Sequence, residues 1–172
     1  MITLTTPRLT LKPLNSTYLS SVHEYASDIE NTRYMERLPN ESIEETKAFL
    51  QRTEEEWTRK EPSFYEFAVL YQGKQIGAVS IYREGENECE MGWIIHKNYW
   101  RQGFAYEAAS ALMEYSIQKL HIKHFVAHCD AANTASYKVM EKLGMTRTDT
   151  YGGRKNKAAS EESTEYKYER FL

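Results

Sequence analysis

The chain has 172 residues, of which 41% are hydrophobic and 27% are charged, and its formal net charge is −3. This length and composition are typical of one globular domain with a substantial core, so we expect a single domain over residues 1–172. The weak negative charge and the lack of a basic block argue against a nucleic-acid partner. No apolar run approaches the roughly 18 residues of a membrane span, and the first residues do not resemble a signal peptide. We therefore expect a cytoplasmic protein without a membrane partner.

The first third of the chain predicts one strand and two helices. Residues 8–14 alternate polar and apolar side chains, as a half-buried strand does. A first helix is expected from the caps at residues 15–17 to about Ala26, and a second from Ser42 to about Lys60. The buried side of the second helix is predicted from its sparse apolar residues, Ile43, Ala48, Phe49 and Trp57.

Three strand-like runs follow and predict an antiparallel meander. They cover Phe64–Tyr71, Gln75–Tyr82 and Glu88–Ile95, and the pair Gln72-Gly73 between the first two is typical of a tight turn.

The last part of the chain predicts two helices and three strands. A helix is expected from about Gly103 to Leu120, and a shorter one from its cap Asn133 to Leu143. The expected strands are His124–Cys129, Met145–Tyr151 and Thr164–Leu172. The polar segment 152–163 is expected to be a mobile loop. The whole pattern predicts an α/β (α+β) fold with a mixed, mostly antiparallel sheet of about seven strands and helices on both faces.

A basic turn between the third meander strand and the long helix is the first candidate for a functional site. Arg101-Gln102-Gly103-Phe104-Ala105 combines a cation with a glycine that lets the backbone approach another group closely. Free N–H groups and the helix dipole at such a position favour a phosphate or another anion. A plain strand-to-helix connection explains the same residues, and the spacing alone does not separate the two interpretations.

A second helix start, at Asn133, lies after the next strand. Asn133 could simply cap its helix. If the two preceding strands are neighbours, both helix starts open at one end of the sheet, where ligands gather in open sheets.

Three motifs together resemble the GNAT acetyltransferases, and within them the RimJ/RimL-type branch. They are Glu90–Ile95, Tyr99–Ala108 and the run from Asn133 through Ser136 to Met145; the opening Thr6–Leu14 also resembles that branch. The resemblance covers essentially the whole chain in the right order of elements. It implies an N-acetyltransferase with acetyl-CoA as co-substrate and no metal.

The resemblance also implies roles for particular residues. The N–H groups of Arg101 to Ala105 would hold the CoA pyrophosphate, while Trp93 to Ile95 would pair with the pantetheine arm as an added strand. The cofactor-binding residues implied in this way are Trp93, Ile94, Ile95, Arg101, Gln102, Gly103, Phe104, Ala105, Tyr106, Asn133 and Ser136.

Two positions depart from the wider family pattern. Trp100 stands where many members carry Gln or Arg, and Met140 stands where many carry a tyrosine that protonates the leaving thiolate. Ser136 is then the first candidate for that acid, and Tyr137 the second. Glu90 matches the family's strand carboxylate and is the candidate general base; the alternative is that it is an ordinary polar residue near a strand start.

The histidines do not predict a metal site. On one strand, His124 and His128 would lie about 13 Å apart, too far for one zinc ion, so we expect solvated or packing side chains. No nucleophile-elbow motif supports a hydrolase triad.

The acceptor is expected to be a primary amine: a protein N-terminus, a polyamine, an amino acid or an aminoglycoside. We expect it against the first two helices and the 152–163 loop, near Arg33, Tyr34 and Met35. The alternatives are a non-catalytic acyl-CoA-binding or sensing module, which Trp100 and Met140 favour, and a nucleotide-binding protein. The final strands would be sheet edges that a homodimer could cover.

Overall fold

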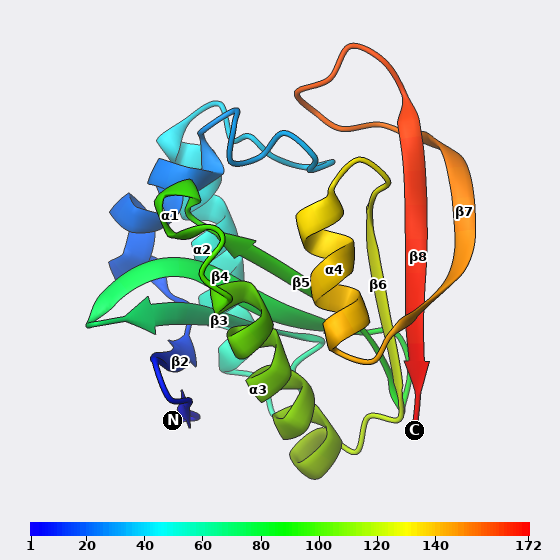
Figure 1. The fold of residues 1–172 in the computed structure, drawn as a ribbon. Helices are drawn as coiled ribbons and strands as arrows, with labels where there is room; N and C mark the ends of the chain where they lie inside the picture. The colour runs from blue at the N-terminus through cyan, green and yellow to red at the C-terminus, as the bar shows by residue number, and fades with distance from the viewer.

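Eight strands form one sheet in the computed structural model, which describes residues 1–172 (Figure 1). The strands are β1 (Leu4–Thr5), β2 (Leu9–Pro13), β3 (Phe64–Tyr71), β4 (Lys74–Arg83), β5 (Glu88–Ile95), β6 (His124–Asp130), β7 (Thr146–Arg154) and β8 (Ser163–Phe171). The helices are α1 (Leu19–Ala26), α2 (Ile43–Trp57), α3 (Phe104–Leu120) and α4 (Thr134–Lys142), with 3-10 turns at Ser16–Tyr18 and Lys97–Tyr99.

The order across the sheet is β1-β2-β3-β4-β5-β6-β8-β7. Every neighbouring pair is antiparallel except β5 and β6, which run parallel. The predicted fold class and the meander are confirmed. The count of about seven strands is one short, because the two-residue strand β1 pairs with β2.

Helices cover both faces of the sheet (Figure 1). The larger core cluster joins the sheet to α3 and α4, with Phe67, Leu112 and Phe125 fully buried. The smaller cluster joins the other face to α1 and α2. The side chains of β5 alternate between these faces, so Cys89 and Met91 lie in the larger core while Ile94 packs against the smaller one.

The predicted buried side of α2 is partly wrong: Phe49 and Trp57 pack against the two core clusters as expected, but the fully buried residues are others. Its buried residues are Thr46, Leu50, Thr53 and Glu56. Ala48 is exposed and Ile43 is 45% exposed. The buried polar groups have local partners: Thr46 Oγ1 lies 2.8 Å from His23 Nδ1 and accepts a 2.8 Å bond from Asn40. Hydrogen bonds of this kind offset the cost of burying hydroxyls and carboxylates.

The parallel pair β5–β6 is short, and this shapes the molecule. Only Glu88, Cys89 and Glu90 pair with β6, opposite His124, Phe125 and Val126. Beyond Glu90 the two strands diverge (Figure 1), while β5 stays paired with β4 as far as Ile95. The outer edge of β5 is therefore free of strand pairing over its second half.

Candidate active site

The free edge of β5 offers backbone groups that an extended ligand could pair with. The N–H of His96 donates to Ile76 O on β4 at 2.7 Å. By the alternation of an antiparallel ladder, the backbone groups of Ile94 then point to β4, and those of Trp93 and Ile95 point to the open edge. Of the three residues predicted to pair with pantetheine, Trp93 thus presents its backbone to the opening.

The carbonyl of Ile95 already has two partners. Asn31 Nδ2 donates to it at 3.1 Å and Trp100 Nε1 at 2.7 Å. The side chain of Asn31 also accepts from Lys97 N at 2.6 Å, so its amide bonds the end of β5 much as another strand would. The Trp100 side chain therefore has a structural role, because its indole N–H binds the last carbonyl of β5.

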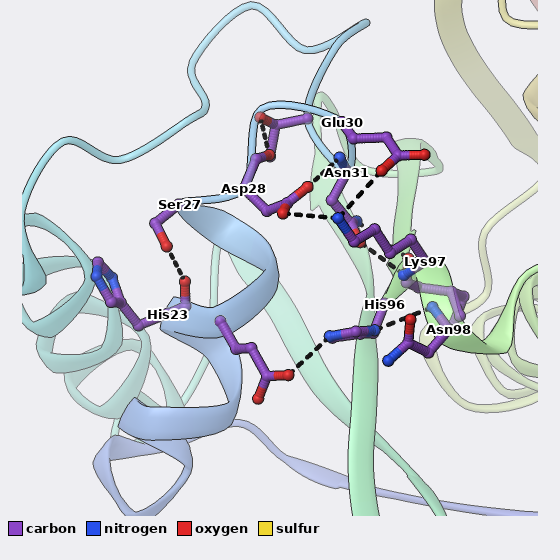
Figure 2. Close-up of polar contacts among 11 residues, drawn as sticks. His23, Ser27, Asp28, Glu30, Asn31, His96, Lys97 and Asn98 are labelled. Atoms are coloured by element: carbon purple, nitrogen blue, oxygen red, sulfur yellow. Dashed lines mark hydrogen bonds and ion pairs between the residues drawn. The ribbon is translucent and has the colours of Figure 1, made fainter.

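Charged side chains hold Asn31 in place, as Figure 2 shows. Asp28 accepts from Asn31 N at 2.8 Å, and Lys97 Nζ pairs with Asp28 at 2.9 Å and with Glu30 at 3.1 Å. The hydrogen bond from Lys97 is the main cause that lowers the pKa of the Asp28 carboxyl. The connection between α1 and α2 is thereby fastened to the end of β5.

The start of α3 is a tight turn with free N–H groups. Arg101 and Gly103 have φ values of 61° and 79°, and Gly103, the N-cap residue, makes no side-chain cap bond. The N–H groups of residues 101–106 donate none of the turn, loop or cap hydrogen bonds. These groups, the helix dipole and the exposed cation of Arg101 make a site suited to a phosphate group.

The N-terminal segment holds this turn in position. Arg8 donates to Gln102 O at 2.8 Å and lies over the Phe104 ring at 4.3 Å. Glu107, in the first turn of α3, pairs with Arg8 at 2.7 Å and accepts from Thr6 Oγ1 at 2.6 Å. Sequence reasoning did not assign Arg8 or Glu107 a role, although Thr6-Pro7-Arg8 opens one of the stretches that carry the family resemblance.

At the start of α4, Asn133 acts as a helix cap, because its Oδ1 accepts from Ser136 N at 3.3 Å. Tyr137 lies beside the rings of Tyr166 and Tyr168, at centroid distances of 5.7 and 6.4 Å. With Arg147 these three tyrosines line a hollow of about 310 Å³ that does not include Glu90. Met140 is 1% exposed and is part of the larger core.

Glu90 lies at the point where β5 and β6 diverge and contacts a histidine. Its Oε1 is 2.9 Å from His128 Nδ1, and this hydrogen bond is the main cause that raises the pKa of His128 above its ordinary value of 6.5. The same two strands carry a second contact, between Glu88 and His124 at 2.9 Å. The alternation of side chains along each strand could have indicated both contacts, but only once β5 and β6 were known to be neighbours.

A polar hollow of about 230 Å³ opens beside this pair. Its lining residues are Glu84, Glu88, Glu90, Val126, His128, Tyr151 and Lys167. No group of three or more His, Cys, Asp or Glu side chains is arranged to hold a metal ion.

The segment 152–163, predicted to be a mobile loop, is anchored in the structure. Arg154, still in β7, pairs with Glu165 at 2.6 Å and donates to Tyr34 O at 2.8 Å. Asp130 accepts from Asn156 at 2.6 Å and from Ser163 at 2.5 Å. The segment thus joins the end of β6 to the connection before α2, where Tyr34 takes part through its backbone, while Arg33 is exposed.

Comparison with known proteins identifies the family. The model of the acetyltransferase (GNAT) domain matches residues 8–146, and the chain belongs to this family of acetyltransferases. The chain is 32% identical over 148 residues to YnaD of Bacillus subtilis, an uncharacterized N-acetyltransferase, covering 84% of this chain and 82% of that protein. No helix has both the length and the apolar character needed to cross a membrane.

Solved structures agree with this fold. A GNAT acetyltransferase from Bacillus anthracis superposes with a TM-score of 0.84 at 26% identity, over 99% of this chain and 98% of that one. RimL, a ribosomal L7/L12 alpha-N-protein acetyltransferase solved with coenzyme A, gives a TM-score of 0.88 at 17% identity over the same shares. The likeness to RimL concerns the fold.

Proposed function

We propose that the protein is an acetyl-CoA-dependent N-acetyltransferase that moves an acetyl group to a primary amine by direct attack in a ternary complex. The observation that carries this proposal is the juxtaposition of a free strand edge on β5 with the free N–H groups at the start of α3. The first suits an extended amide-containing arm and the second suits a diphosphate, and coenzyme A contains both.

In this proposal the CoA pyrophosphate lies on the N–H groups of residues 101–106, and Arg101 supplies a counter-charge. The pantetheine arm pairs chiefly with Trp93, because Ile94 serves β4 and the Ile95 carbonyl is occupied. Asn133 and Ser136, at the start of α4, would face the arm from the other side of the opening. Ser136, or else Tyr137, would protonate the departing thiolate.

Glu90 belongs to the catalytic group in this proposal. An ammonium ion must lose a proton before it attacks the thioester, and Glu90 with its hydrogen-bonded partner His128 stands where the strands open. The polar hollow beside them gives the amine a route from the face opposite α3.

The acceptor classes stay as predicted: a protein N-terminus, a polyamine, an amino acid or an aminoglycoside. The RimL structure is that of a protein N-terminal acetyltransferase, which supports placing a peptide amine first in a screen. A cytoplasmic location, a single domain over residues 1–172 and a homodimer also remain predictions.

The test is a thiol-release assay with acetyl-CoA and a panel of a serine-starting hexapeptide, spermidine, L-lysine and kanamycin. We expect release of free CoA with at least one amine. A second candidate, a non-catalytic acyl-CoA-binding module, is favoured by the buried Met140 and the structurally engaged Trp100. Tight CoA binding by calorimetry together with no turnover of any amine would establish that module instead.

A further inference from the structure

Two histidines cross from β6 to carboxylates of β5, but their ring nitrogens are used differently. His124 contacts Glu88 through Nδ1 at 2.9 Å and Glu169 through Nε2 at 2.5 Å, so both nitrogens are engaged. His128 contacts Glu90 through Nδ1 and makes no hydrogen bond through Nε2. Only His128 therefore keeps a ring nitrogen available for another group.

The position of His128 matches a role in proton transfer. Glu90 and Val126 are the last paired residues before the strands diverge, and His128 follows Val126 by two residues on the same face of β6. Its side chain lines the polar hollow of about 230 Å³. A carboxylate that accepts the Nδ1 proton fixes the tautomer in which Nε2 carries a lone pair.

We propose that His128, oriented by Glu90, is the general base that deprotonates the acceptor amine. This assignment rests on the proposed function and divides the role foreseen for Glu90: the carboxylate positions the imidazole, and the imidazole takes the proton. A histidine suits the task, because an imidazole is the side chain that ordinarily exchanges a proton near neutral pH.

The reaction balances without another reactant. His128 Nε2 takes one proton from the ammonium ion, and the neutral nitrogen forms a bond to the acetyl carbonyl carbon. The bond from that carbon to sulfur then breaks, and the CoA thiolate takes a proton from the hydroxyl of Ser136, or else of Tyr137, which regains a proton from the same nitrogen. His128 releases its proton to solvent, leaving the amide and free CoA.

The pH dependence follows from the surroundings of His128. Glu90 on β5 and Glu165 on β8 raise its pKa, and Lys167 on β8 lowers it. Tyr151 on β7 and the carboxylates Glu84 and Glu88 line the same hollow. The protonated imidazole cannot act as a base, so kcat/KM should rise with pH through a single step above pH 6.5.

The test is the pH profile of kcat/KM for whichever amine of the panel turns over fastest. In His128→Asn, which can still donate to Glu90, we expect kcat/KM at pH 7.5 to fall about 100-fold or more and the acidic step to disappear. In Glu90→Gln we expect the step to remain and to move to lower pH. Added imidazole should restore activity to His128→Ala.

His124→Asn is the matched control, since it alters the same kind of contact on the same two strands but leaves Nε2 of His128 free. Its acidic step should be unchanged. A wild-type step that persists in His128→Asn and vanishes in Glu90→Gln would overturn the assignment and make Glu90 the base. No turnover of any amine by the wild type would overturn the proposed function itself and this assignment with it.

Discussion

One buried carboxyl, that of Glu66, shows how the protein tolerates an ionisable group in its interior. Glu66, on β3, is 7% exposed and accepts a hydrogen bond from Tyr82 at 2.8 Å. Burial raises the pKa of its carboxyl to about 7, although hydrogen bonds from Tyr82 and Ser80 oppose the shift. Burial in the folded protein therefore favours the protonated, uncharged form of the Glu66 carboxyl near neutral pH.

Replacing Glu66 with Gln tests this interpretation through stability. The folded-state pKa of Glu66 lies above the ordinary value of 4.5, so the folded protein holds this proton more tightly than the unfolded chain does. The stability that the protonated carboxyl contributes is complete below pH 4.5 and is lost as the pH rises through about 7. Glu66→Gln should escape this loss and gain up to about 3 kcal/mol relative to wild type between pH 5 and pH 8. Urea unfolding at both pH values measures the difference.

Glu55→Gln is the control for that experiment, because Glu55 is exposed on α2. Its effect on the free energy of unfolding should be the same at pH 5 and pH 8. An equally constant effect for Glu66→Gln would contradict the raised pKa.

At the scale of elements, the sequence predicts where helices and turns begin better than it predicts which distant residues contact one another. The caps Ser42 and Asn133 and the turn at Gly103 mark their helix starts, because each depends on neighbouring residues alone. The buried polar residues of α2 could not be predicted, because the partners of Thr46 lie outside the helix, among them His23 on α1.

In the candidate site, too, local features could be predicted from the sequence and contacts between distant residues could not. The turn that opens α3 is readable from its glycine and arginine, whereas the contact between Glu90 and His128 depends on a strand pairing that joins residues far apart in the chain. The anchoring of the segment 152–163 was missed for a similar reason. Its small polar residues look like a free loop until Asp130 and Tyr34 are placed beside them.

The element that opens α3 gives a prediction about donor binding. Arg8→Ala removes the bond to Gln102 O and the contact with the Phe104 ring, so the turn loses a support. We expect KM for acetyl-CoA to rise about tenfold, as for the loss of one charge-assisted hydrogen bond, with KM for the amine unchanged. Steady-state kinetics with each substrate varied in turn measure both.

Lys12→Ala serves as the comparison, because Lys12 is exposed on β2, away from the turn. It should leave both KM values as they are. A rise in KM for the amine with no change for acetyl-CoA would show that Arg8 does not support a donor site.

Across the whole molecule, two polar connections join parts that the sheet leaves apart. Asn31, held by Asp28 and Lys97, fastens the connection between α1 and α2 to β5, on one side of the opening (Figure 2). Arg154 and Asp130 fasten the β7–β8 segment to that same connection and to β6, on the other side. These two loops, the connection between α1 and α2 and the segment between β7 and β8, thereby bridge the opening between β5 and β6. Loss of order in one loop should therefore loosen the other.

Arg154 is the test of this linkage, since its side chain is 7% exposed and contacts Glu36, Glu165, Asn156 and the carbonyl of Tyr34. Arg154→Met should cost about 3 kcal/mol of stability, because it leaves a largely buried carboxylate without its partner. Amide hydrogen exchange should then become faster in residues 34–39 and 155–162 together.

Lys157→Met is the control: it removes one exposed hydrogen bond to Pro39 O and should cost less than about 1 kcal/mol of stability. If exchange in Arg154→Met became faster in only one of these two segments, the two segments would be ordered independently, and the linkage between them would be contradicted.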